Sequence, residues 1–302
     1  MTTQTMDKPM TQADAGSAPD EEPHLTLAAS TGWSALNLRE VWVYRDLIWT
    51  LAGRDVKLRY KQTVLGVLWV VLQPLVQAGI FSFIFGVVAG LPAGNGKPVM
   101  VVTFVGTLSW NLFSNILSRV SGCLVGNSGL ISKVYFPRLV LPLSVLPSVM
   151  LDFAVSLGML AILMAAYGVV PGVEILLMPV FLWIMLLMAL GAGLWAAALM
   201  VPYRDVGQIL PVAVQMLTYA SPVAYSAVVL VEKLTKWVGP QWAAAYYLNP
   251  LVGILEACKW SMTGTPMPPV WSMAYAGGMS VALLVGGAMV FKKMERRFAD
   301  VI

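Results

Sequence analysis

Charged residues are scarce in this chain. Only 11% of its 302 residues are Asp, Glu, Lys or Arg, whereas soluble domains contain roughly 25%. Apolar residues make up 58% of the sequence. A polypeptide with so little polar surface cannot remain dissolved in water, so the composition predicts a polytopic membrane protein and excludes an ordinary soluble domain.

Histidine and cysteine are also nearly absent. The single histidine, His24, excludes a metal site or a catalytic triad that is built on histidines. Two cysteines, Cys123 and Cys258, support no disulfide framework. The net charge of +4 is carried by basic residues that lie beside apolar runs. They act there as topology determinants, and we expect no nucleic-acid partner.

A nucleotide-binding loop is missing too. The nearest match, Gly90–Pro98, has one residue too many between its glycines and has Pro98 where a Ser or Thr is needed. The sequence also contains no zinc-ligand spacing, Gly-x-Ser-x-Gly motif or paired carboxylates. We therefore expect no catalytic centre, no metal and no cofactor on this chain.

Long uncharged runs are what the sequence does have. Residues Thr63 to Ala89 carry no charge, and at ~1.5 Å per residue they can cross a hydrocarbon layer of ~30 Å. A cluster of basic residues directly precedes this run and marks its cytoplasmic end. The cluster consists of Arg54, Lys57, Arg59 and Lys61.

The hydropathy pattern predicts an all-α protein with six transmembrane helices. Their approximate ranges are 63–90, 99–121, 139–167, 174–200, 206–226 and 270–291. With this topology, fifteen of the nineteen Lys and Arg residues lie on the side of the two termini. Cytoplasmic loops are enriched in Lys and Arg, so both termini are expected in the cytoplasm. Glycines that recur in the spans, such as Gly191 and Gly287, are expected to be sites of close helix packing.

Two segments precede this transmembrane domain of residues 62–302. Residues 1–30 are polar and acidic and lack the apolar centre of a signal peptide, so they are expected to form a disordered cytoplasmic tail. Residues 31–61 have a helical period and predict an amphipathic helix at the membrane surface; packing on a soluble domain is the alternative. We expect the apolar residues of this helix to share one side. They are Leu38, Val41, Trp42, Ile48, Trp49, Leu51 and Ala52.

The segment Ala227–Pro269, between the fifth and sixth spans, is amphipathic and is broken at Gly239–Pro240 and Asn249–Pro250. This pattern predicts re-entrant helices that dip into the outer leaflet, or alternatively a loop folded on the outer surface. Within it, Glu256 and Lys259 are one helical turn apart and are expected to form a local ion pair.

Asp152 lies about midway along the third predicted span. A carboxyl group at this depth is costly, so it is a functional candidate. Proton coupling would need a second ionisable group, and we expect no partner from the other spans. We favour a structural role, in which Asp152 is protonated or hydrogen-bonded to a neighbouring helix.

Several strings resemble the membrane subunits of ATP-binding-cassette exporters for lipid-linked polysaccharides, which serve O-antigen, capsule and teichoic-acid export. Together they cover roughly residues 35–295 in consistent order. The matching strings are Leu58–Pro74, Gly129–Ser144, Pro202–Val206, Ser221–Pro222 and Tyr247–Trp260.

The resemblance implies a homodimer with a pathway between its copies. It also implies two copies of a separate ATPase that holds ATP and Mg²⁺, and a polyprenyl-pyrophosphate-linked polysaccharide as cargo. The chain would then be a transport subunit in the bacterial inner (plasma) membrane and no enzyme. The alternatives are an exporter of drugs or small lipids with the same fold, an ion-coupled secondary transporter, and a membrane glycosyl- or phosphotransferase.

Three groups of residues are candidates for function under this resemblance. The first is a loop that contacts the ATPase, or else an ordinary solvated loop: Lys133, Tyr135, Phe136 and Arg138. The second receives the lipid pyrophosphate, or only anchors the chain at anionic lipid: Arg54, Lys57, Arg59 and Lys61. The third lines the glycan path, or belongs to an interfacial aromatic belt: Trp69, Phe81, Trp110 and Tyr225.

Overall fold

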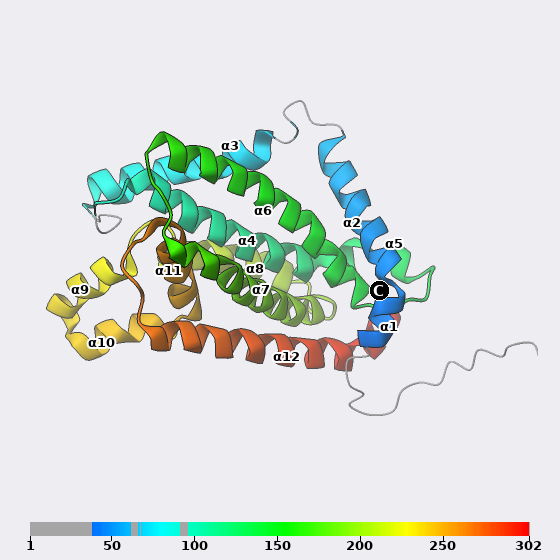
Figure 1. Ribbon diagram of the computed structural model, residues 1–302. Helices are drawn as coiled ribbons and strands as arrows, with labels where there is room; N and C mark the ends of the chain where they lie inside the picture. The colour runs from blue at the N-terminus through cyan, green and yellow to red at the C-terminus, as the bar shows by residue number, and fades with distance from the viewer. Residues whose placement is uncertain (1–37, 62–65, 67, 91–95, 302) are drawn as a thin grey trace, which may run out of the picture. The chain divides into compact units, whose positions relative to one another are not determined.

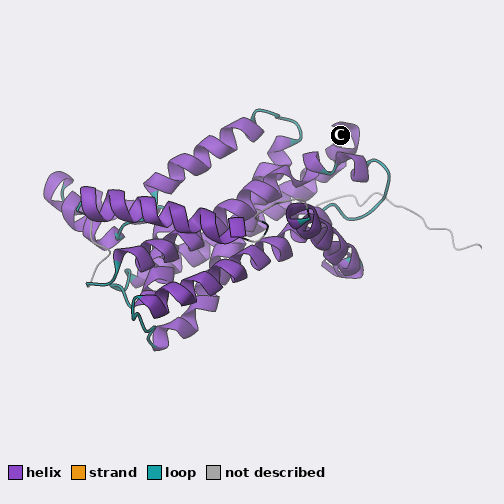
Figure 2. Ribbon diagram, turned by 90° about the horizontal axis from the view of Figure 1, so that it is seen from above, coloured by secondary structure: helices purple, strands orange, loops and turns teal. Residues whose placement is uncertain are grey.

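The computed structural model describes residues 38–61, 66, 68–90 and 96–301 (Figure 1). The predicted tail, residues 1–30, lies outside this part of the chain. The described residues form helices, turns and loops without any strand (Figure 2), which confirms the all-α prediction.

The amino-terminal half begins with α1 (Leu38–Val43) and α2 (Arg45–Tyr60), followed by α3 (Leu68–Phe81), which continues as a π-helix, η1 (Ser82–Val88). Two long helices follow. The remaining elements of this half are α4 (Val99–Gly126), the single turn α5 (Ser128–Ile131) and α6 (Val140–Ala166).

The carboxy-terminal half starts with a 3-10 turn, η2 (Val173–Leu177), which leads into α7 (Met178–Met200). Several shorter elements separate it from the last helix. They are α8 (Val206–Ala220), α9 (Ala227–Val238), α10 (Pro240–Ala244), η3 (Ala245–Leu248) and α11 (Pro250–Thr263), and the last helix is α12 (Val270–Val301).

Five stretches among the described residues are long and apolar enough to cross a membrane, and they coincide with five of the six predicted spans. They are Leu68–Val88, Val99–Gly126, Val140–Ala166, Val173–Met200 and Val270–Glu295. The predicted span 206–226 instead contains α8, an apolar helix of 15 residues that ends at Ala220. At ~1.5 Å per residue α8 covers only ~22 Å, and the non-helical residues 221–226 follow it.

Helix α4 is the centre of the core. Most of its residues are buried, and it packs on α6, α7, α3 and α11. Helices α7 and α12 form the most extensive pair. A Cβ atom on Gly287 would overlap the carbonyl oxygen of Gly191, and a Cβ on Gly191 would overlap the backbone of α12. The predicted packing role of these two glycines is confirmed, because only residues without a side chain permit this approach.

The two surface helices α1 and α2 have apolar side chains on more than one side. Val41, Leu51 and Ala52 are buried, and α2 packs on α6. Trp42 and Trp49 are 69% and 66% exposed. The expectation that all these residues share one side is therefore wrong: one strip contacts the helical bundle, and the two tryptophans lie on another.

The segment between α8 and α12 breaks where its sequence indicates. Gly239 has φ 88°, which suits glycine, and it separates α9 from α10. Asn249 caps α11, because its side-chain oxygen accepts a hydrogen bond from the Leu251 N–H at 3.1 Å. Helix α11 is buried almost throughout and packs on α4, α7 and α12. Its insertion into a leaflet stays a prediction.

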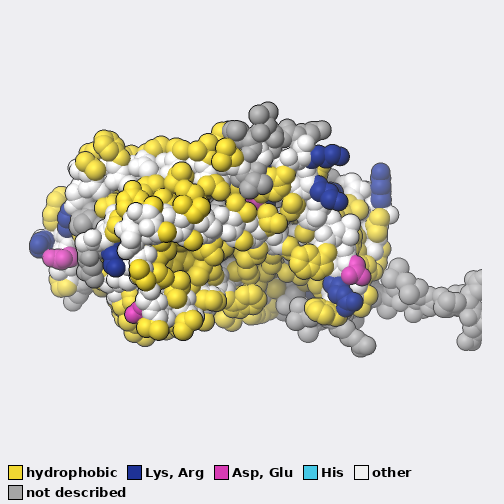
Figure 3. Space-filling view, turned by 45° about the horizontal axis from the view of Figure 1, so that its top comes forward, with side chains coloured by type: hydrophobic (Ala, Val, Ile, Leu, Met, Phe, Trp, Pro, Cys, Tyr) yellow, Lys and Arg dark blue, Asp and Glu magenta, His cyan; other side chains and the backbone are white. Residues whose placement is uncertain are grey.

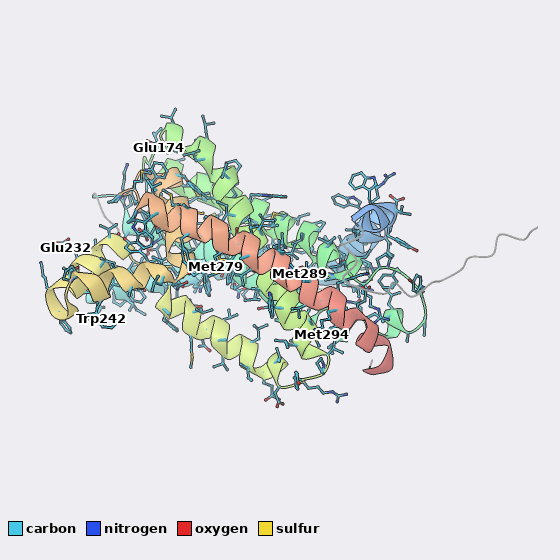
Figure 4. All side chains as sticks on the ribbon, turned by 90° about the horizontal axis from the view of Figure 1, so that it is seen from below. Glu174, Glu232, Trp242, Met279, Met289 and Met294 are labelled. Carbon is cyan, nitrogen blue, oxygen red and sulfur yellow. The ribbon has the colours of Figure 1, made fainter. Side chains whose placement is uncertain are left out.

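Most of the surface visible in Figure 3 is hydrophobic, and the Lys and Arg side chains on that face gather towards its two ends. Figure 4 shows Glu174 and Glu232 towards one end of the helices and Met294 of α12 near the other. In the predicted topology the end with Glu174 and Glu232 is the outer one. We call these the outer end and the inner end below.

Candidate functional site

A cluster of four polar side chains joins α2, α4 and α6. The Asp152 carboxylate on α6 accepts hydrogen bonds from Arg59 of α2 and, at 3.1 Å, from Arg119 of α4. Tyr60 donates to the other carboxylate oxygen at 2.6 Å. We call Arg59, Tyr60, Arg119 and Asp152 the inner cluster. The inner cluster connects α2 to two spans, because Arg59 and Tyr60 of α2 and Arg119 of α4 all donate to Asp152 of α6.

The structural role expected for Asp152 is confirmed by these bonds. The expectation that no other span offers a charged partner is wrong, because Arg119 of α4, within the predicted span 99–121, bonds to Asp152. The pKa of Tyr60 is raised to about 12, first by burial and then by its hydrogen bond to Asp152. Tyr60 is thus a neutral donor at physiological pH.

The four basic residues expected at the lipid head split into two pairs. Arg54 donates to the Asn127 side chain at 2.9 Å and also pairs with Asp55, and Arg59 belongs to the inner cluster. Lys57 and Lys61 are exposed. The side chains of the two lysines are therefore free to meet a ligand or lipid, whereas the two arginines hold α2 against other helices.

In the loop between α4 and α6, only some of the residues predicted to contact the ATPase are exposed. Tyr135 is 73% exposed, and Lys133 is also exposed. Phe136 is 5% exposed and belongs to the hydrophobic core, so, unlike Tyr135, it does not present its ring to a partner. A hollow of about 230 Å³ lies within the turn of residues 131–138. Arg138, at the end of the loop, contacts Glu295 of α12.

A second polar cluster lies near the outer end. Lys259 and Glu256 of α11 form an ion pair of 2.6 Å, and both side chains are almost fully buried. This confirms the expected local pair. Lys259 also donates to the Tyr225 carbonyl at 2.7 Å. The Tyr225 hydroxyl donates to the Tyr219 carbonyl at 3.0 Å and lies 2.9 Å from the Tyr246 hydroxyl, which therefore donates to it. We call Tyr225, Tyr246, Glu256 and Lys259 the outer cluster.

Aromatic rings connect the first span to this region. Phe81 packs edge-on against Phe85 and Tyr219, with ring centroids 5.9 and 6.4 Å apart. Phe85 lies 5.5 Å from Tyr225. Sequence reasoning selected Phe81 and Tyr225 but not Phe85 and Tyr219, because only the fold brings Phe85 beside Tyr225 and Tyr219 beside Phe81.

The other two aromatic candidates lie elsewhere. Trp69 is 53% exposed near the start of α3. Trp110 is 2% exposed and packs on Phe113 inside the chain. Trp110 therefore does not line an accessible surface of this chain, contrary to expectation. The described residues contain no group of three His, Cys, Asp or Glu that could hold a metal ion.

Comparisons with known proteins give a consistent picture. A family model described as "ABC-2 type transporter" matches residues 46–262. An O-antigen export system permease protein RfbA from Myxococcus xanthus is 28% identical over 265 residues, covering 88% of this chain and 98% of that protein. A protein of the same name from Klebsiella pneumoniae is 27% identical over 265 residues, covering 85% of this chain and 95% of that protein.

Proposed function

This chain belongs to the ABC-2 type transporter family, and on that premise we propose that it is the permease subunit of an ATP-driven polysaccharide exporter. Its cargo is a polyprenyl-pyrophosphate-linked glycan of the O-antigen or capsule class, which crosses the bacterial inner membrane. The observation that carries this proposal is the similarity to O-antigen export permeases along nearly the whole length of both chains.

The energy comes from a separate ATPase subunit that binds Mg²⁺ and hydrolyses ATP, because the sequence of this chain has no Walker-type loop. Two copies of that ATPase contact a homodimer of this chain. The exposed Tyr135, with Lys133, forms the contact at the inner end. This loop joins α4 to α6, so a force on it acts on two spans directly.

A second copy of the chain has a suitable surface in α8. None of the fifteen residues of this helix is buried. Its exposed side chains include Gln208 and Gln215 and four large apolar ones, Ile209, Val212, Met216 and Tyr219. Pairing through α8 would place the aromatic row of Phe81, Phe85, Tyr219 and Tyr225 beside the dimer axis. Aromatic faces stack on sugar rings, so this row is the surface on which we place the glycan.

Topology and lipid recognition complete the proposal. Helix α8 together with residues 221–226 forms the fifth of six spans, α9 to α11 re-enter from the outer face, and both termini are cytoplasmic. Lys57 and Lys61 attract the anionic pyrophosphate, whereas Arg54 and Arg59 hold the surface helix in place. Substituting the two lysines should therefore reduce export more than membrane insertion.

The direct test is reconstitution of the chain with and without its partner ATPase. We expect ATP-dependent movement of lipid-linked polysaccharide only in the complex, and accumulation of finished polymer in the cytoplasm of a deletion strain. Transport by the isolated chain under a proton gradient would contradict the proposal. Movement of a drug or small lipid in place of the glycan would favour the alternative cargo.

A further inference from the structure

The loop between α4 and α6 is fixed at both ends by side chains from distant parts of the sequence. At its start, Arg54 of α2 donates to the side-chain oxygen of Asn127 at 2.9 Å. At its end, the backbone N–H of Arg138 donates to the carboxylate of Glu295 at 3.2 Å. The first contact involves the surface helix, and the second involves the inner end of the last span.

The second contact lies beside the amino end of α6. This helix is 27 residues long, its N-cap is Leu139, and it has neither a side-chain cap nor an acidic residue in its first turn. Its first N–H groups are bonded within the chain, because Val140 and Leu141 donate to the carbonyls of Pro137 and Arg138. The Arg138 N–H, directly before the N-cap, is bonded by the Glu295 carboxylate, which also lies near the partial positive charge of the helix end.

Glu295 is held in position by further contacts. Its second carboxylate oxygen pairs with Lys292 at 2.7 Å, and its carbonyl oxygen accepts a hydrogen bond from the Arg138 guanidinium at 3.3 Å. The Glu295 side chain is 18% exposed. Both carboxylate oxygens are thus engaged at a site that is partly shielded from water, where a charge–dipole contact is less screened than at an open surface.

We propose that Glu295 is the positioning residue that connects the loop 127–138 to α12. A displacement of the loop then reaches three spans: α4 and α6 through the chain itself, and α12 through the Arg138–Glu295 contacts. Because α12 packs closely on α7 at Gly191 and Gly287, the movement continues to a fourth span. The inference rests on the proposed function, in which this loop contacts the ATPase.

The test uses the complete exporter with its ATPase and compares Glu295→Ala, Glu295→Gln and the control Lys293→Gln on the same helix. We expect Glu295→Ala to lower the stimulated ATPase rate per assembled complex by roughly fivefold, the size of a partly buried charge–dipole contact. Glu295→Gln should lie between Ala and wild type, because its amide oxygen still accepts the Arg138 N–H. Lys293→Gln should leave the rate unchanged.

A second measurement follows the loop itself. Spin labels at Ser132→Cys in the loop and Met289→Cys on α12 report the distance between them, and the native Cys123 and Cys258 are buried. We expect Glu295→Ala to broaden this distance distribution in the assembled complex, whereas Lys293→Gln should not.

A further variant distinguishes the positioning role of Glu295 from the contact between the loop and the ATPase. Tyr135→Ala tests the contact between loop and ATPase. If it abolishes stimulation while both Glu295 variants keep the wild-type rate and distances, the positioning role is wrong and the proposed function stands. If Tyr135→Ala has no effect, the proposed contact itself fails. A Glu295→Ala variant that lowers only the amount of complex, with an unchanged rate per complex, would also overturn the positioning role.

Discussion

The inner and outer clusters solve the problem of polar groups among apolar helices in different ways. In the inner cluster, Asp152 draws its partners from two other helices, and Arg59 remains 35% exposed. In the outer cluster, Glu256 and Lys259 are neighbours on one helix and are 1% and 2% exposed. The first joins separate elements at a partly exposed site, whereas the second neutralises two charges inside the protein.

This difference has an energetic meaning. A buried charge that loses its partner retains its full desolvation cost, whereas a charge that water can reach is partly resolvated. The outer cluster should therefore lose more stability than the inner cluster when one of its charged partners is removed. Four measurements test this contrast.

The largest effect is expected at Lys259. Lys259→Met leaves the Glu256 carboxylate buried without a cation, and removing one member of such a pair costs about 3–5 kcal/mol. Unfolding of the purified chain in mixed micelles measures the loss. The double variant Glu256→Gln/Lys259→Met should recover most of it. A small effect of Lys259→Met alone would mean that water enters the outer cluster.

Close packing near the outer cluster gives the second prediction. A Cβ atom at Gly106 of α4 would overlap the carbonyl oxygen of Val223, so Gly106→Ala should destabilise the chain by about 1–3 kcal/mol. Gly122→Ala on the same helix is the control, because no atom outside its helix backbone lies within 4 Å of its Cβ position. Equal stabilities of the two variants in the same unfolding assay would argue against the rigid outer packing.

A smaller loss is expected in the inner cluster. Asp152→Asn removes the charge that two arginines share, and we expect a cost of about 1–2 kcal/mol, because hydrogen bonds to charged groups are reduced by solvent exposure. Adding Arg119→Gln should cost less than it does in the wild type. A double-mutant cycle on unfolding free energies measures this coupling. Strict additivity would show that Arg119 and Asp152 do not interact.

The smallest effect concerns pH. The pKa of Tyr60 is about 12 in the folded chain, against 10.0 for an ordinary tyrosine. The folded state therefore holds this proton more tightly, so stability from Tyr60 is constant below pH 10 and falls between about pH 10 and 12. The difference in stability between wild type and Tyr60→Phe should shrink over this window. A difference that is independent of pH would contradict the raised pKa.

Local features were predictable from the sequence. Five spans follow from long apolar runs, and the Glu256–Lys259 pair follows from a spacing of three residues on one helix. The breaks at Gly239 and Asn249 follow from residues that favour turns and caps. In each case the sequence pattern and the structural feature that it predicts involve the same short stretch of the chain.

Features that depend on distant contacts were not predictable in this way. Arg59 and Asp152 are 93 positions apart, and periodicity says nothing about which helices become neighbours. Phe136 points inward because the core behind the loop accepts its ring, although its neighbours Tyr135 and Lys133 are exposed. The early end of α8 was not predicted, because residues 221–226 carry no charge and continue the uncharged run of the helix. The helical backbone nevertheless ends before Ser221–Pro222.

The early end of α8 has a consequence for the backbone beyond it. Residues 221–226 are buried but have left the helix, so their carbonyl groups need donors from elsewhere, which hydrocarbon cannot offer. The Thr103 hydroxyl donates to the Ala224 carbonyl at 3.3 Å, and the Lys259 ammonium donates to that of Tyr225 at 2.7 Å. One lysine thus serves as the counter-ion of Glu256 and also replaces a missing helical N–H.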